Sequence, residues 1–169
     1  NVYMAQDDEA FYFCAVVTDD NHWANPELYW AADCIQLGFT TNGSYGPEIG
    51  LYFDGKKSYI DSPIGKEDEM SFVGKRDGST SVYEYKIPWT TLYSEKPDGK
   101  IVFNFLINDG DNNKREAFIE WTPGIGYSKS PDTITMKFVT KENNEFAQWI
   151  DALSEVILNE AQKMYINLL

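Results

Sequence analysis

The sequence predicts an all-β protein, an antiparallel β-sandwich of the jelly-roll or immunoglobulin-like kind, followed by a C-terminal amphipathic α-helix. Short runs rich in Val, Ile, Phe and Tyr recur between turn sequences such as TNGSYG, KRDG and DGDNN. Within most of these runs apolar and polar residues alternate, as they do in a strand with one face in a core. No helical pattern separates the runs, which argues against a parallel α/β sheet.

The individual strands follow from this alternation. The run Phe11–Thr18 is apolar on both faces, which is typical of a central strand whose second face is also covered. In the run Cys34–Thr40, Leu37 points to one face and Gln36 to the other, so that one face belongs in a core and the other carries an amide. The expected strands are Val2–Ala5, Phe11–Thr18, Cys34–Thr40, Glu48–Phe53, Met70–Gly74, Ser81–Ile87, Ile101–Asn108, Ala117–Trp121 and Ile134–Thr140.

The end of the chain has a different period. From Phe146 onward apolar residues recur at helical spacing, which predicts an amphipathic helix of about six turns. We therefore expect a β-sandwich domain over residues 1–140 and a helix within residues 141–169. This helix either packs on the sandwich or connects it to a following domain, and its unfinished apolar stripe favours the connector.

The charge of the chain excludes several classes of partner. The sequence has 14 basic and 27 acidic residues, a formal net charge of −13. Such a field repels phosphate backbones and anionic lipid headgroups, so we expect neither nucleic acid nor a membrane surface as a partner. The longest apolar run, residues 11–17, is also too short to span a bilayer.

The two cysteines are expected to be free. If the strands that hold Cys14 and Cys34 form a hairpin around residue 25, the two residues lie roughly 10 Å apart along the strand, at ~3.4 Å per residue. A disulfide requires a Cα separation below ~7 Å. We therefore expect two free, half-buried thiols.

The sequence gives little support for an enzyme. Acids such as Glu84 and Glu120 could supply the carboxylate pair of a glycoside hydrolase, but in so acidic a chain most acids are solvated or form turns. The only histidine, His22, lies in an expected loop, and the sequence contains no HExxH motif and no phosphate-binding glycine loop. We therefore expect a non-catalytic protein.

The segment NDGDNN has two interpretations. Asp109, Asp111 and Asn113 occupy alternate positions, which is the opening spacing of an oxygen-rich calcium loop. The same residues are equally compatible with an Asx-rich hairpin turn that binds no metal. Asp20 is a further candidate ligand, from the segment Asp19-Asp20-Asn21.

Aromatic and amide side chains form the stronger functional pattern. Six such residues can be placed on one sheet face or its rim: Trp30, Gln36, Asn104, Asn108, Tyr52 and Tyr127. An aromatic ring covers the apolar C–H face of a sugar, while a planar amide offers paired donors and acceptors to its hydroxyl groups. Together these residues favour a saccharide site, although each alone is compatible with a structural role.

Several motifs together resemble carbohydrate-binding module family 9. They are FYFCAVVTDD, WAADCIQLGF, YEYKIPWTTL, FNFLINDGDNNKREAFIEW and GYSKSPDTITMKF, in that order over roughly residues 2–140. The resemblance implies a β-sandwich, a structural calcium ion, no catalysis, and a sugar held between two aromatic rings. It also implies a larger secreted or cell-surface bacterial protein, whose other domains are partners of the module. Family members usually have a further N-terminal strand, which this chain lacks before Val2.

The resemblance assigns roles to individual residues. Trp30 matches the first of the two rings, Tyr127 lies one place from the second, and Gln36 stands where sugar-binding members have a glutamate. Two polar positions differ, since an arginine is replaced near Gly50 and a glutamine by Leu106. The sequence therefore predicts a module that binds an oligosaccharide or polysaccharide. The alternative is a structural or adhesion spacer that has lost the sugar site.

Arg115 and Trp121 match family positions that we interpret as structural. We expect Arg115 to pair with Asp109 or a neighbouring acid across a hairpin.

Overall fold

The computed structural model describes residues 1–41, 43–127 and 134–137. The chain divides into two compact units, Asn1–Met136 and Lys137–Leu169. The expected helix within residues 141–169 and the end of the expected strand Ile134–Thr140 lie outside the described residues. Among the described residues, no helix is long and apolar enough to cross a membrane.

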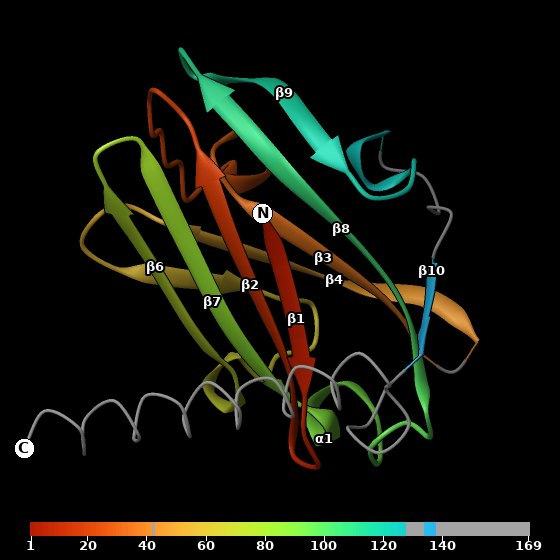
Figure 1. Cartoon of the computed structure of the whole chain (residues 1–169). Helices are drawn as coiled ribbons and strands as arrows, with labels where there is room; N and C mark the ends of the chain where they lie inside the picture. The colour runs from red at the N-terminus through yellow and green to blue at the C-terminus, as the bar shows by residue number, and fades with distance from the viewer. Residues whose placement is uncertain (42, 128–133, 138–169) are drawn as a thin grey trace, which may run out of the picture. The chain divides into compact units, whose positions relative to one another are not determined.

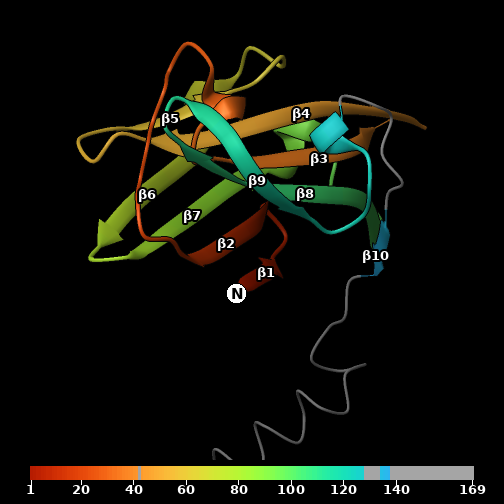
Figure 2. The same ribbon diagram turned by 90° about the horizontal axis from the view of Figure 1, so that it is seen from above.

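The first unit is a sandwich of two sheets, in which the strand pairs among β1 to β9 are antiparallel (Figures 1 and 2). One sheet has the order β1-β2-β7-β6, and the other has the order β10-β8-β3-β4-β5, with β9 paired to β8. The strands are β1 (Val2–Gln6), β2 (Ala10–Thr18), β3 (Ile35–Thr41), β4 (Ser44–Phe53), β5 (Ser58–Asp61), β6 (Ser71–Asp77), β7 (Thr80–Pro88), β8 (Lys100–Asp111), β9 (Lys114–Glu120) and β10 (Ile134–Lys137). The short helices are η1 (Tyr29–Ala31), η2 (Glu67–Glu69), α1 (Trp89–Leu92) and η3 (Ile125–Tyr127).

The predicted β-sandwich is confirmed, and every predicted strand is present with shifted ends. The additional strand is β5, which sequence analysis missed because its run is only four residues long and follows directly on a turn. It pairs with β4 at the edge of its sheet.

The expected hairpin between the strands of Cys14 and Cys34 is wrong. β2 pairs with β1 and β7, whereas β3 pairs with β4 and β8, so the two cysteines belong to different sheets. The connection over residues 19–34 is long enough to cross from one sheet to the other, and the general preference for pairing of consecutive strands does not hold here. Both thiols are free. Cys14 is half-buried, but Cys34 is fully buried, and burial raises the pKa of its thiol to about 12.

Aromatic residues from both sheets form the core. The ring of Phe103 on β8 lies 5.3 Å from that of Phe11 on β2 and 4.9 Å from that of Phe39 on β3, centroid to centroid. These distances fall in the favourable range for aromatic pairs. All three side chains are almost completely buried. Phe103 therefore joins the two layers directly.

Both faces of β3 are buried: one packs in the core, and the other forms part of the outer face of the sheet. Leu37 is fully buried in the core, whereas Gln36 points to the outer face and retains 7% exposure. On that outer face Gly50 of β4 lies opposite Gln36. A Cβ added at Gly50 would lie 2.2 Å from a ring atom of Tyr29, so the missing side chain leaves room for Tyr29 to pack flat on the sheet. The candidate site is built on this face.

We expect Phe103→Ala to reduce the free energy of unfolding by about 3–5 kcal/mol, because it removes a ring that contacts both sheets and leaves a cavity. Urea denaturation followed by fluorescence measures the change. Tyr3→Ala is the control, because Tyr3 is 59% exposed on an edge strand. A loss for Phe103→Ala no larger than that of the control would contradict this account of the core.

Candidate functional site

The buried carboxylate of Asp33 attaches the loop over residues 19–34 to β8. Asp33 is 3% exposed. Its Oδ2 accepts a hydrogen bond from the backbone N–H of Trp23 at 2.7 Å, and its Oδ1 accepts one from the N–H of Gly110 at 2.8 Å. Hydrogen bonds to a charged acceptor are among the stronger ones in proteins. The loop that carries η1, and with it Trp30, is therefore held against β8.

Gly110 allows the backbone of η1 to lie directly on β8. A Cβ added there would lie 2.5 Å from Cα of Ala32 and 2.7 Å from the carbonyl oxygen of Ala31. Both contacts are to backbone atoms, which cannot move away as the end of a side chain can. The absence of a side chain at this position thus sets the distance between η1 and the sheet.

A pocket of about 250 Å³ opens beside η1 on the outer face of the sheet. Trp30 is 48% exposed, and the guanidinium carbon of Arg115 lies 6.0 Å from its ring centroid, a cation–π distance. The pocket combines aromatic and apolar walls with an amide, a carboxylate and a guanidinium group. Its lining residues are Tyr29, Trp30, Gln36, Glu48, Arg115 and Ile125.

The structure brings two of the predicted sugar ligands, Trp30 and Gln36, together in this pocket. Tyr52 is only 7% exposed and does not line it; its ring is stacked between those of Tyr29 and Tyr59, with centroid distances of 5.5 and 5.0 Å. Tyr127 is the last residue of η3, two residues after the pocket residue Ile125, and its side chain lies outside what the structure describes.

Asn104 does not reach the pocket. It is fully buried, its Nδ2 donates to the carbonyl of Thr122 at 2.9 Å, and its Oδ1 accepts from the N–H groups of Phe105 and Thr122. Every polar atom of its side chain thus has a backbone partner. Asn104 fixes the turn that follows β9 instead of offering an amide to a ligand.

Arg115 is a pocket residue that sequence analysis placed elsewhere. It donates to Oδ1 of Asn108 at 3.3 Å and to the carbonyl of Gly126 at 2.8 Å, and the expected ion pair with Asp109 is not among the ion pairs of the described residues. The register between β8 and β9 shifts after Asp109, at a β-bulge. A bulge reverses which residues share a face, so simple alternation could not place Arg115. Glu48 and Ile125 were also missed.

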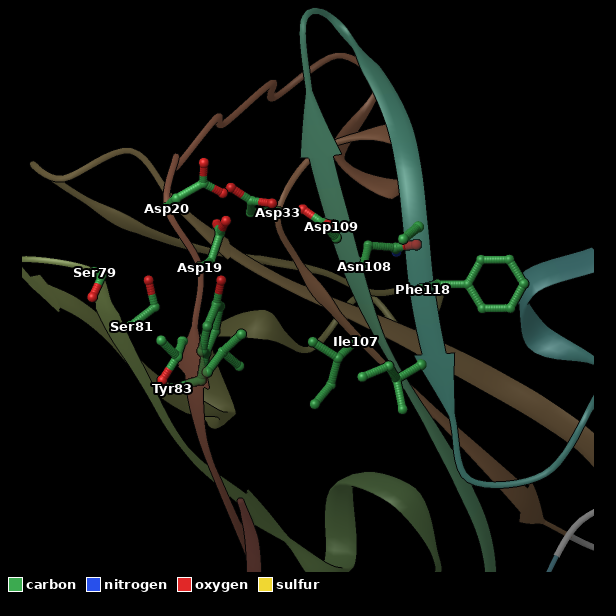
Figure 3. A pocket seen from close by; sticks show the side chains of 14 residues that line it. Asp19, Asp20, Asp33, Ser79, Ser81, Tyr83, Ile107, Asn108, Asp109 and Phe118 are labelled. Atoms are coloured by element: carbon green, nitrogen blue, oxygen red, sulfur yellow. The ribbon is translucent and has the colours of Figure 1, made fainter.

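A second cavity, of about 490 Å³, is lined by residues of β2, β7, β8 and β9 (Figure 3). Carboxylates gather at one end of it, and Tyr83 and Ile107 line the rest. Burial raises the pKa of Asp19, and the charge of Asp33 raises it further; burial and the charge of Asp19 likewise raise the pKa of Asp109. Carboxylate oxygens are the type of ligand that calcium prefers. The acidic residues of the cavity are Asp19, Asp20, Asp33 and Asp109.

The segment NDGDNN forms the turn of a β-hairpin. β8 extends to Asp111, and Asn112 and Asn113 form a tight turn to β9, with φ of 51° and 65°. Asp111 accepts a hydrogen bond from Nδ2 of Asn21 at 2.5 Å. Of the four predicted metal ligands, Asp20 and Asp109 line the acidic cavity, whereas Asp111 and Asn113 are not among its lining residues.

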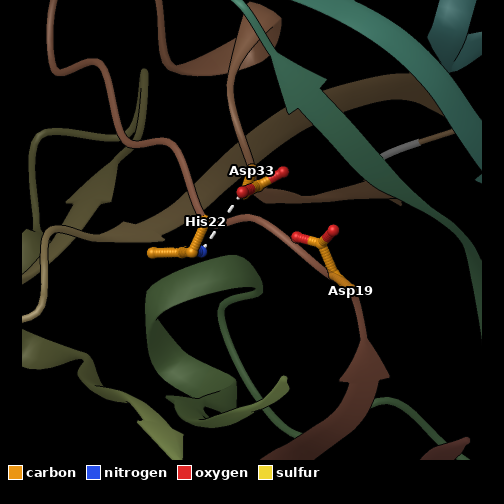
Figure 4. A group of neighbouring side chains, drawn as sticks. All are labelled: Asp19, His22 and Asp33. Atoms are coloured by element: carbon orange, nitrogen blue, oxygen red, sulfur yellow. Dashed lines mark ion pairs between the residues drawn. The ribbon is translucent and has the colours of Figure 1, made fainter. Parts of the chain in front are cut away.

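His22 lies beside this acidic group (Figure 4). Its Nε2 lies 2.9 Å from the carbonyl oxygen of Phe53, and its Nδ1 forms an ion pair with Oδ2 of Asp33 at 3.2 Å, without hydrogen-bond geometry. Burial lowers the pKa of His22, but the contacts with Asp33 and Phe53 outweigh it and the net direction is upward. This favours the imidazolium, which offsets part of the charge on Asp33. Ligand atoms of Asp19, His22 and Asp33 all lie within 4.8 Å of one another.

The family model described as "Carbohydrate family 9 binding domain-like" matches residues 1–134. The chain belongs to this family. The resemblance inferred from its motifs is therefore confirmed, and with it the assignment to a family of carbohydrate-binding modules. No curated protein sequence matches the chain.

Solved structures of the same family share the fold. A family 9 module from Caldicellulosiruptor kristjanssonii in complex with glucose has a TM-score of 0.64 at 15% identity, over 85% of this chain and 78% of the other. A family 9 module from the same organism in complex with cellotriose has a TM-score of 0.61 at 17% identity, over 83% of this chain and 76% of the other. At these identities the likeness supports the fold.

We expect Gly110→Ala to displace η1, because the added methyl group meets backbone atoms of Ala31 and Ala32. The free energy of unfolding should fall by about 1–3 kcal/mol, as in other overpacked sites. Val73→Ala is the control, because Val73 is 58% exposed on the edge strand β6. Urea denaturation of both variants measures the difference. Equal losses would show that the contact between η1 and β8 is not tight.

Proposed function

We propose that this chain is a non-catalytic carbohydrate-binding module that holds a saccharide in the pocket beside η1. The observation that carries the proposal is the half-exposed indole of Trp30 next to the largely buried amide of Gln36. An exposed aromatic plate beside fixed polar groups suits the two kinds of surface that a sugar presents. Family membership and the sugars bound to the two solved neighbours support the same function.

The pocket supplies each type of contact that a sugar ring needs. Trp30 covers the C–H face, Ile125 adds apolar surface, and Gln36, Glu48 and Arg115 offer donors and acceptors to hydroxyl groups. Tyr127 remains the proposed second ring, because it lies two residues after the pocket residue Ile125 in η3.

We propose no hydrolytic role for the acids. The carboxylate of Glu120 accepts hydrogen bonds from the backbone N–H groups of Gly124 and Gly126, so it supports the turn that leads into η3. We further propose that the module belongs to a larger secreted or cell-surface polypeptide and serves to hold its other domains at a saccharide. The resemblance of the motifs to family 9 modules supports this context.

Trp30→Ala should weaken saccharide binding about tenfold or more, because it removes the stacking surface while leaving the core intact. Isothermal titration with glucose and cello-oligosaccharides measures the affinity, and near-UV circular dichroism reports folding. Trp121→Ala is the control, because Trp121 is also exposed but packs against Phe105 outside the pocket. If the folded wild-type protein binds nothing in a broad glycan panel, the spacer alternative replaces this proposal.

We also propose that a structural calcium ion is held by the carboxylates of Asp19, Asp33 and Asp109 in the acidic cavity. The residues fit such an ion because their carboxylates line one cavity, where burial and neighbouring acids raise the pKa of Asp19 and of Asp109, which a divalent cation would relieve. Asp20 and the carbonyl groups of the same loop could complete the ligand set.

Calcium should therefore raise the stability of the protein relative to EDTA, by about 2.7 kcal/mol when free calcium is a hundred times its Kd. Thermal unfolding with calcium, magnesium or EDTA measures the shift. It should be lost or reduced in Asp109→Asn and retained in Asp77→Asn, whose residue is exposed at the end of β6. Identical unfolding in calcium and EDTA would rule out the ion.

A further inference from the structure

The orientation of the Gln36 amide is fixed by a chain of hydrogen bonds with a single direction. A guanidinium can only donate, so Oδ1 of Asn108 must be the atom that faces Arg115, at 3.3 Å. Nδ2 of Asn108 then donates to Oε1 of Gln36 at 2.9 Å and to Sγ of Cys34 at 3.0 Å. Asn108 is 3% exposed, so it has no freedom to turn over. Gln36 therefore uses its oxygen within the protein.

The amino group of Gln36 is left for a ligand. Gln36 is 7% exposed and lines the pocket, and its Nε2 donates no hydrogen bond to any residue in the described part of the chain. This nitrogen is not among the fully buried polar atoms that lack a partner in the described residues, so it faces the pocket. A ligand that displaces water from it must offer an acceptor in return or leave a desolvated donor unpaired, at a cost of about 1–3 kcal/mol.

A hydrogen-bond acceptor, the carboxylate of Glu48, lies on the neighbouring strand β4. Gly38 lies opposite Glu48 and Gln36 lies opposite Gly50, so Gln36 and Glu48 are diagonal neighbours on one face, ~7–8 Å apart. One oxygen of Glu48 accepts a hydrogen bond from the hydroxyl of Tyr45 at 2.5 Å, which leaves the other as an acceptor. The pocket thus has fixed donors on one side, from Gln36 and Arg115, and a fixed acceptor on the other.

We infer that the pocket selects a sugar with an acetamido group, the class of N-acetylhexosamines. This inference rests on the proposed function. The carbonyl oxygen of the group accepts from Nε2 of Gln36 and from Arg115, its N–H donates to Glu48, and its methyl group packs against Trp30 or Ile125. No other common sugar substituent has one acceptor, one donor and one apolar end in so small a unit.

Charge argues against the nearest competitor. The carboxylate of a uronic acid also suits Gln36 and Arg115, but it would lie close to Glu48 in a chain with a net charge of −13. A plain hydroxyl can donate and accept in either direction, so it gains least from donors and acceptors that are fixed in advance. The acetamido group alone uses both sides of the pocket.

Isothermal titration of the full 169-residue chain with glucose, glucuronate and the N-acetyl derivatives of glucosamine, galactosamine and mannosamine tests this inference. At least one acetamido sugar should bind about tenfold more tightly than glucose or glucuronate. Gln36→Glu converts the donor into an acceptor and should weaken binding of that sugar about tenfold or more. Glu48→Gln should also weaken it.

The control for the added charge is Asn25→Asp, because Asn25 lies outside the pocket lining and its Oδ1 acceptor, which holds the N–H groups of Glu27 and Leu28, is kept. It should leave the preference unchanged. Urea denaturation confirms that each variant is folded.

If glucose binds as tightly as every acetamido sugar, the inference is overturned and the proposed function stands. The inference also fails if a folded Gln36→Glu variant keeps the full preference for the acetamido sugar. If the folded wild-type protein binds none of these sugars, nor any other in a broad glycan panel, the proposed function fails together with the inference.

Discussion

The hydrogen bonds accepted by the buried carboxylate of Asp33 are the interaction on which the candidate site depends. They join the backbone of the loop at Trp23 to the backbone of β8 at Gly110, and the ion pair with His22 adds a third contact. Without this acceptor two backbone N–H groups would lose their partners, at a cost of about 1–3 kcal/mol each if they stayed buried. Gly110, which has no side chain, lets η1 lie directly on the sheet at this point. The hydrogen bonds of Asp33 therefore also determine the position of the Trp30 indole, which η1 carries.

One face of β3 packs in the core and stabilises the fold, and the other face contributes to the candidate site. The core face, with Phe39 against Phe11 of the other sheet, holds the layers together, so the strand is a rigid base for the residues on its outer face. On the outer face the stacked rings of Tyr29, Tyr52 and Tyr59 support the side of the pocket. A glycine at position 50 is the condition for this arrangement. The position at which the family resemblance suggests an arginine is therefore filled by an aromatic ring from η1.

Asp33 also connects the pocket with the acidic cavity. It lines that cavity with Asp19 and Asp109, while its hydrogen bonds hold the loop that presents Trp30. A cation bound among these carboxylates would therefore stabilise the loop and, through it, the sugar-binding surface. Calcium and saccharide binding would then be linked through the side chain of Asp33.

Much of the fold and part of the site follow from the sequence alone. Alternation located the strands and separated Leu37 from Gln36, and the aromatic and amide pattern brought Trp30 and Gln36 into one hypothesis, because these signals depend only on residue type and spacing. The sequence could not show that Cys14 and Cys34 lie in different sheets, or that a bulge directs Arg115 into the pocket. Nor could it show that both polar atoms of the Asn104 side chain hydrogen-bond to the backbone of a turn. Those features are decided by the tertiary structure, because strand pairing, register shifts and the satisfaction of buried polar groups depend on residues that are distant in the chain.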